Sequence, residues 1–291
     1  MSDKPLDNHF VLTFSCPDRP GIVSEVSGHL HGRGGNILAA RQFSDPETGI
    51  FFMRVEIEFE NGAVNAESLT ESFAPIAEKY GMNWKLRCSS QIKRVVILVS
   101  KFDHCLGDML YRMRIGELEM DVAAIISNHP QDALNLGGFG DIPYHHLPIT
   151  PETKQEQEAK IRGVIEDTGA ELVVLARYMQ ILSDEMAQYL DGRCVNIHHS
   201  FLPGFKGAKP YHQAHSRGVK MIGATAHFVT SNLDEGPIIS QDVEPVTHAD
   251  TPADLVRKGR NIEQRVLSRA VGWLLEDRVF MNGNKTVVFG A

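Results

Sequence analysis

The feature that most constrains the fold is a series of short, almost uninterrupted apolar runs in the second two-thirds of the chain. RVVILVS begins the series at Arg94, and DVAAIISN, ELVVLAR, CVNIHHS and IGATAHFV follow it. Strands that are buried on both faces of a parallel sheet have this composition, because helices cover both faces. Helical segments lie between the runs, and this alternation predicts a doubly wound α/β fold with a mostly parallel, Rossmann-like sheet.

A long amphipathic helix is predicted to follow the strands. The segment TPADLVRKGRNIEQRVLSRAVGWLLED begins at Thr251, and Pro252 stands where proline is favoured in the first helical turn. Leu255, Ile262 and Val266 recur at helical spacing, which predicts one apolar face that packs against the sheet.

Residues 8–88 show a different pattern. Alternating apolar and polar residues predict four strands, and two amphipathic segments predict helices, in the order βαββαβ. This order is typical of a ferredoxin-like sandwich of one sheet and two helices. The short polar segment 89–93 is predicted to be a linker, and residues 94–291 to form the second domain.

Composition excludes several classes of protein. The net charge of −8 argues against a nucleic-acid partner, which usually meets a basic surface. No apolar run is long enough to span a membrane, and the N-terminus, MSDKPLDNHF, lacks the features of a signal peptide. The 4 cysteines include no CxxC pair, so free thiols and a cytoplasmic location are expected.

Asn196 and His198 are the first candidates for chemistry. They stand two residues apart at the end of an apolar run, so their side chains point to the same side of the strand. Open α/β sheets bind their ligands at the carboxyl ends of the strands. Asp234, on a loop before Gly236 and Pro237, is the best candidate for a carboxylate that completes the pair.

The first block resembles the ACT domain, a small amino-acid-sensing module. The DRPGI and GGNI segments match its first strand–helix loop and the start of its second strand. The resemblance implies a homo-oligomer, dimer or tetramer, and an amino-acid effector held by Asp18, Arg19, Pro20, Gly21, Ile22 and Asn36. The alternative is that the loop is only a turn and that the block serves assembly alone.

The second block resembles the folate-dependent formyltransferase family. NIHHSFLPGFKG and the later LDEGPIISQ match its catalytic segments, which implies that Asn196, His198 and Asp234 are the catalytic residues. The LARYMQILS segment matches the part of the family that holds the pterin of 10-formyltetrahydrofolate. The implied folate contacts are Met179, Gln180, Leu182 and Val229. Neither a metal nor another cofactor is expected, because Asn196 and His198 can both donate to the oxygen of an already reactive formyl group.

The segment after the first strand of this block departs from the pattern of the glycinamide ribonucleotide transferases. Lys101, Phe102 and Asp103 replace the small residues that hold the acceptor phosphate in those enzymes. An aromatic ring and a carboxylate are expected to exclude that acceptor, and Phe102 and His199 are therefore predicted to line the pocket. An ACT-like block joined to this catalytic block resembles the members of the family that pass the formyl group to water. The resemblance implies hydrolysis of 10-formyltetrahydrofolate to formate and tetrahydrofolate, which supplies formate for purine biosynthesis.

Three alternatives stay open. The first is a formyltransferase with a different amine acceptor, and the second is a non-catalytic folate sensor. The third is a metal-dependent amidohydrolase, although the sequence has no HExxH motif. The sequence does not decide the roles of His129, His145, His146, His212 and His215.

Overall fold

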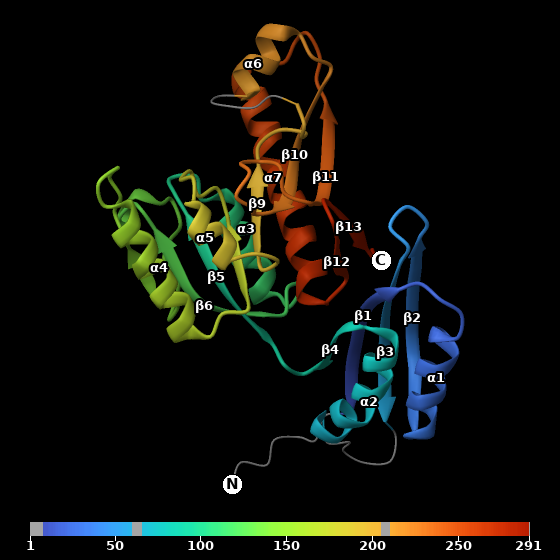
Figure 1. Cartoon of the computed structure of the whole chain (residues 1–291). Helices are drawn as coiled ribbons and strands as arrows, with labels where there is room; N and C mark the ends of the chain where they lie inside the picture. The colour runs from blue at the N-terminus through green and yellow to red at the C-terminus, as the bar shows by residue number, and fades with distance from the viewer. Residues whose placement is uncertain (1–7, 60–65, 205–209, 291) are drawn as a thin grey trace. The chain divides into compact units, whose positions relative to one another are not determined.

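The computed structural model describes residues 8–59, 66–204 and 210–290 (Figure 1). The chain divides into two compact units. The first unit contains the chain up to Ile92 and two C-terminal segments, Asp277–Asn282 and Val287–Ala291. The second contains Lys93–Glu276 and Gly283–Thr286. The sequence predicted a boundary at 89–93 but did not anticipate that C-terminal segments join the first unit.

The first unit is a sandwich of two helices on an antiparallel sheet, which confirms the predicted ACT-type fold. Its elements are β1 (His9–Pro17), α1 (Ile22–Gly32), β2 (Gly35–Asp45), β3 (Ile50–Phe59), α2 (Ala66–Tyr80) and β4 (Asn83–Cys88). The strand order is β2-β3-β1-β4. Alternate side chains of the strands, such as Phe14 and Val55, are buried against Val26 of α1 and Phe73 of α2.

The opposite face of this sheet receives β12 (Val279–Asn282). The rings of Phe52 and Phe280 lie edge to face with their centroids 5.8 Å apart. The Nδ2 of Asn282 donates a hydrogen bond of 2.6 Å to the carboxylate of Asp45. The sequence analysis predicted no strand after the long helix, because these segments are too short to show a clear alternation.

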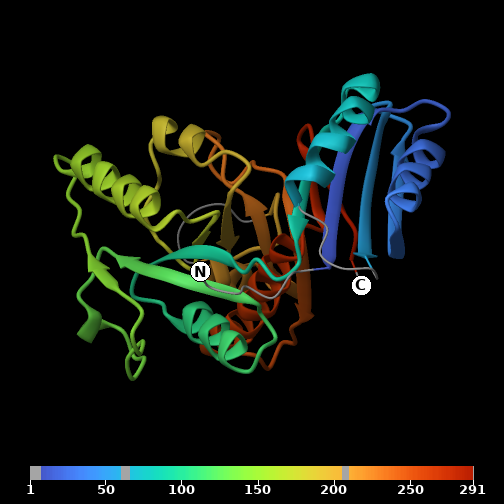
Figure 2. The same ribbon diagram turned by 90° about the horizontal axis from the view of Figure 1, so that it is seen from below.

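The second unit is a seven-stranded sheet with the order β11-β10-β9-β8-β5-β6-β7. Helices α4 and α5 lie on one side of the sheet, and α3 and α7 lie on the other (Figure 2). The strands are β5 (Lys93–Val99), β6 (Met120–Ser127), β7 (Tyr144–His146), β8 (Leu172–Leu175), β9 (Cys194–His198), β10 (Met221–Phe228) and β11 (Ile238–Pro245). The helices are α3 (His104–Arg114), η1 (Gln131–Ala133), α4 (Lys154–Thr168), α5 (Asp184–Tyr189), α6 (Pro210–Arg217) and α7 (Pro252–Leu275). The last strand of the chain, β13 (Lys285–Val288), pairs with β12 in a separate two-stranded sheet. This architecture confirms the predicted doubly wound fold.

The direction of β10 differs from that of the other apolar runs. Strands β9, β8, β5, β6 and β7 are parallel, but β10 pairs antiparallel with both β9 and β11. The apolar character of β10 therefore reflects burial on both faces and does not report the direction of the strand. In this register His227 lies directly opposite Asn196.

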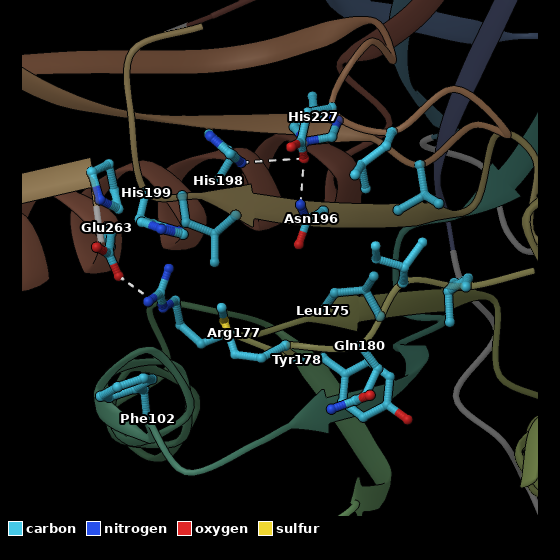
Figure 3. A pocket seen from close by; sticks show the side chains of 18 of the residues that line it. Phe102, Leu175, Arg177, Tyr178, Gln180, Asn196, His198, His199, His227 and Glu263 are labelled. Atoms are coloured by element: carbon cyan, nitrogen blue, oxygen red, sulfur yellow. Dashed lines mark hydrogen bonds and ion pairs between the residues drawn. The ribbon is translucent and has the colours of Figure 1, made fainter. Parts of the chain in front are cut away.

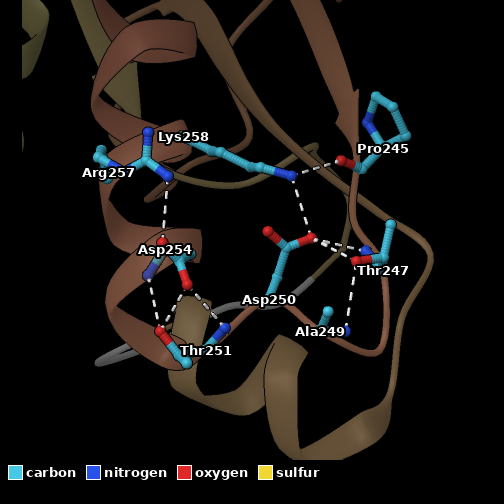
Figure 4. A network of polar contacts seen from close by, with 8 residues as sticks. All are labelled: Pro245, Thr247, Ala249, Asp250, Thr251, Asp254, Arg257 and Lys258. Atoms are coloured by element: carbon cyan, nitrogen blue, oxygen red, sulfur yellow. Dashed lines mark hydrogen bonds and ion pairs between the residues drawn. The ribbon is translucent and has the colours of Figure 1, made fainter.

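The start of α7 is fixed by a network of polar side chains (Figure 4). The hydroxyl of Thr251 accepts from the backbone N–H of Asp254, and the Asp254 carboxylate accepts from the backbone N–H of Thr251. This reciprocal cap satisfies N–H groups that the first helical turn leaves unpaired. The hydrogen bonds from Thr251 lower the pKa of Asp254 to about 2. Lys258 adds an ion pair of 3.1 Å to Asp250 in the preceding loop.

The cysteines and the helices bear on two predictions that were made from composition. All 4 cysteines are free, and Cys16, Cys105 and Cys194 are buried. Among the described helices, none combines the length and the apolar character that a membrane crossing requires.

A close backbone approach fixes the loop that carries Asp234. The N–H of Phe228 donates to the carbonyl of Pro237 over 2.9 Å, so the chain returns tightly after β10. Gly236 lies inside this return, and a Cβ atom there would stand 1.8 Å from the carbonyl oxygen of Phe228. Only glycine can occupy this position without a shift of the backbone.

We therefore expect Gly236→Ala to lower the free energy of unfolding by about 1–3 kcal/mol, the usual range for forced overpacking. Chemical denaturation would measure the change. The matched control is Gly137→Ala, because a Cβ at Gly137 meets no atom within 4 Å. Equal stability of the two variants would show that the return of the chain is not tight in solution.

Candidate active site

The largest group of predicted site residues lies in one cavity of about 620 Å³ in the second unit. The cavity opens where β8 and β9 end, which is where an open α/β sheet places its ligands. Asn196, His198 and Asp234 all line it. In Figure 3, Gln180 lies toward one end of the cavity and Phe102 toward the other.

His198 and Asp234 form an ion pair in the wall of the cavity. Nδ1 of His198 lies 3.2 Å from Oδ1 of Asp234, and their side chains are only 7 % and 14 % exposed. The hydrogen bond from His198 lowers the pKa of Asp234, so this carboxylate is charged at neutral pH. Nε2 of His198 is buried and has no hydrogen-bond partner in the described part of the chain. The imidazole therefore has one nitrogen committed to Asp234 and one nitrogen available to a ligand.

Asn196 is oriented by His227, a residue to which the sequence analysis assigned no role. Nδ1 of His227 lies 2.8 Å from the carbonyl oxygen of Phe228, which can only accept, so Nδ1 carries the proton. Burial lowers the pKa of His227, and the neutral ring therefore presents Nε2 as an acceptor. Nδ2 of Asn196 lies 3.2 Å from this Nε2 and donates to it. The pairing directs the amide of Asn196, and only the antiparallel register of β10 brings the two residues together.

The residues predicted to hold folate form an apolar wall of the same cavity. Met179, Gln180, Leu182 and Val229 all line it. The backbone N–H of Met179 donates to the hydroxyl of Ser100, which ties this segment to the end of β5. Met179 itself is 48 % exposed, so the wall offers open apolar surface to a flat ring system. Contact with folate remains a prediction.

Phe102 and His199 also line the cavity, as predicted. The guanidinium of Arg177 stands 5.4 Å from the centre of the Phe102 ring. Burial lowers the pKa of His199 to about 4, so this ring is neutral at pH 7. Asp103 was expected to face the cavity, but it does not line it. Its carboxylate accepts a hydrogen bond from the backbone N–H of Asn135 instead. The Asp103 carboxylate therefore links the start of α3 to the loop at Asn135. Of the two residues that were expected to exclude a phosphate-bearing acceptor, only Phe102 lines the cavity.

The remaining histidines separate into two groups. His212, near the start of α6, lines the cavity. The described residues that line the cavity do not include His129, His145, His146 or His215. The role of His212 stays open.

One further group of polar side chains lies around Glu263 of α7. His104, Cys105 and Glu263 are the group of potential metal ligands found among the described residues. Burial raises the pKa of the Cys105 thiol well above its usual range, which disfavours the thiolate that a metal needs. Arg177 also lies 3.3 Å from the Glu263 carboxylate, and its charge disfavours a second cation. These residues do not fit a metal centre.

The predicted effector residues lie in the first unit. Gly21 has a φ of 96° and precedes α1, where glycine is favoured. Arg19 stacks on the ring of Tyr80 at 4.3 Å. The side chain of Ile22 is buried in the core, whereas Asn36 is exposed on the edge strand β2. Asp18 and Pro20 are exposed in the loop before α1. An effector role for these residues remains a prediction.

Two family models match the chain. The formyl transferase model matches residues 93–271, and the ACT domain model matches residues 10–71. The first match covers most of the unit that contains the cavity, and the second covers the sandwich of the first unit from β1 to the start of α2.

Individual relatives share both parts. A formyltetrahydrofolate deformylase from Corynebacterium sp. (strain P-1) is 50% identical over 96% of this chain and 97% of the relative. One from Bacillus subtilis (strain 168) is 47% identical over 96% and 93% of the two chains. The crystal structure of the formyltetrahydrofolate deformylase from Burkholderia mallei superposes with a TM-score of 0.92 at 50% identity, over 97% of this chain and 99% of that one. The chain therefore belongs to the formyltetrahydrofolate deformylase family.

Proposed function

We propose that the protein hydrolyses 10-formyltetrahydrofolate to formate and tetrahydrofolate, without a metal or another cofactor. One observation carries the proposal: Nε2 of His198 lacks a partner in the cavity, while Nδ1 is held by Asp234. Asn196 lines the same cavity with a directed amide group. An amide donor, an imidazole nitrogen and a carboxylate thus line one cavity, and these are the groups that acyl transfer to water uses.

The reaction then needs little beyond these three residues. The oxygen of a water molecule bonds to the formyl carbon, and the carbonyl oxygen becomes an oxyanion. Nδ2 of Asn196 donates to this oxyanion, and in the imidazolium form of His198 Nε2 donates to it as well; both contacts stabilise the oxyanion more than the ground state. Asp234 pairs with His198 through Oδ1, which leaves Oδ2 to orient the water and accept its proton. The C–N10 bond breaks as N10 takes the Nε2 proton of His198. Of the two protons that the water gave up, one restores His198 and the other passes to solvent, and formate leaves.

The apolar wall supports folate as the substrate, and the opposite end of the cavity supports water as the acceptor. Met179, Leu182 and Val229 offer surface for the pterin. At the other end, the Phe102 ring lines the cavity where an amine acceptor would need space. In this role the protein supplies formate for purine biosynthesis and balances the one-carbon pools of the cytoplasm.

The first unit supports a regulatory and assembly role. β2 is an edge strand of its sheet, and Leu38 and Phe43 on it are 47% and 43% exposed. Exposed sheet edges are usually covered in soluble proteins, so this edge favours a homo-oligomer. An amino acid bound near Gly21 and Asn36 would act at such a subunit contact.

The direct test of the activity is incubation with 10-formyltetrahydrofolate in amine-free buffer that contains a chelator. We expect formate and tetrahydrofolate to appear in equal amounts, because water is the acceptor and no metal takes part. Formation of formate only after an amine is added would favour the formyltransferase alternative. Loss of activity in the chelator would favour the metal-dependent alternative.

Replacement of the carboxylate tests the mechanism. We expect Asp234→Asn to lower kcat by about two to four orders of magnitude, the usual effect of losing a general base. Folate binding should persist, because the apolar wall is unchanged. The control is Asp121→Asn, whose carboxylate lies in an exposed ion pair with Arg94. Near-normal formate release by a folded Asp234→Asn protein would remove Asp234 from the mechanism.

Regulation can be tested by calorimetry and rate assays with each of the twenty amino acids. We expect at least one to bind and to change the turnover rate, and Asn36→Ala to weaken that binding. If none binds, the first unit serves assembly alone.

A further inference from the structure

Arg177 is a buried cation with two guanidinium nitrogens, Nε and Nη1, that lack hydrogen-bond partners in the described part of the chain. The residue is only 8% exposed, and its Nη1 has no partner in the described part of the chain. Nε lies 3.3 Å from Oε2 of Glu263 but makes no hydrogen bond with it. Because buried polar groups are nearly always paired, such a guanidinium requires an acceptor from outside the chain.

The backbone at Arg177 is also unusual. Its φ is 64°, in the left-handed region that bulky residues rarely adopt. Backbone strain of this kind persists only where the surrounding structure imposes it, and it concentrates at ligand sites. The strained position lies two residues after the end of β8, and the Arg177 side chain lines the cavity.

Glu263 carries the charge opposite to that of Arg177, but its carboxylate accepts its hydrogen bonds from other residues. His104 Nε2 donates to the Glu263 carboxylate at 2.8 Å, and the Tyr211 hydroxyl donates to it at 2.6 Å. Gly259 permits this arrangement, because a Cβ atom there would lie 2.1 Å from Cζ of Tyr211. The carboxylate therefore accepts from two donors outside the guanidinium, and Nε and Nη1 of Arg177 stay available.

The groups around the guanidinium favour a carboxylate as the ligand of its free N–H groups. The Phe102 ring stands 5.4 Å from the guanidinium and packs near it without accepting strong hydrogen bonds. In Figure 3 the guanidinium lies beside Glu263 and near the ring of His199, toward the end of the cavity away from Gln180. A planar guanidinium pairs best with a carboxylate, through two parallel hydrogen bonds.

We propose that Arg177 forms a carboxylate-binding subsite of this cavity, and that its ligand is the formate released by the reaction. The choice of formate rests on the proposed function, because hydrolysis creates a carboxylate at the formyl carbon when the C–N10 bond breaks. The other carboxylates in the substrate are those of the folate glutamate. Arg177 is too deeply buried for a tail that extends toward solvent, which favours formate.

The test titrates ¹³C-labelled formate with the full-length protein in the absence of folate. Broadening of the formate NMR signal, at constant ionic strength, measures the binding. We expect saturable broadening with the wild type. Arg177→Met should weaken formate binding about tenfold or more, since it removes a charge-assisted pair of hydrogen bonds. Arg177→Lys keeps the charge but loses the planar fork, and it should fall between the two. Arg257→Gln is the control, because Arg257 is 70% exposed on α7 and outside the cavity lining.

A second variant keeps the test valid if Arg177→Met does not fold. Arg177→Met leaves Glu263 without its counter-charge, so the double variant Arg177→Met/Glu263→Gln removes both charges. Circular dichroism identifies which variant is folded. Undiminished formate binding by either folded variant would overturn the proposal, as would absence of saturable binding to the wild type.

Two folate compounds distinguish the sources of the carboxylate. We expect formate to bind Arg177 equally well when tetrahydrofolate is present. Displacement of formate by tetrahydrofolate, but not by tetrahydropteroate, which lacks the glutamate, would assign Arg177 to the tail and overturn the choice of formate. Because no turnover is needed, a failure of the proposed hydrolysis would leave the carboxylate subsite intact. Hydrolysis without formate binding at Arg177 would overturn the subsite alone.

Discussion

The antiparallel pairing of β10 with β9 is the constraint on which the candidate site depends. β9 is the last strand of the parallel series, and its register with β10 sets His227 opposite Asn196. The tight return of the chain at Gly236 then brings Asp234 back to within 3.2 Å of His198. A parallel strand in this place would require a long crossover, and the aspartate would lie at a different edge of the sheet.

The same cavity contains two buried polar groups of different character. Asn196, His198 and Asp234 leave a ring nitrogen unpaired beside the apolar folate wall. Arg177 and Glu263 form the second group, in which the carboxylate is fully paired and the guanidinium is not. Unpaired buried groups lower stability and are retained where a ligand completes them. In the roles proposed here, the first group binds the reacting carbonyl and the second binds an anion.

Much of this arrangement could be predicted from the sequence, because it depends on local pattern. The period of two places Asn196 and His198 on one side of β9, and the buried strands have continuous apolar runs. The direction of β10, the role of His227 and the unpaired guanidinium of Arg177 could not be predicted. Each depends on which strands pair and on what surrounds a side chain, and residue order alone does not contain that information.

The central claim is that one formyl oxygen meets Asn196 and His198 at the same time. A crystal structure of the protein with a stable analogue that retains the formyl group of 10-formyltetrahydrofolate tests this claim most directly. The account predicts that the formyl oxygen lies about 3 Å from both Nδ2 of Asn196 and Nε2 of His198, with the pterin against Met179 and Val229. A formyl group placed out of reach of His198, for example beside Glu263 and His104, would contradict the account.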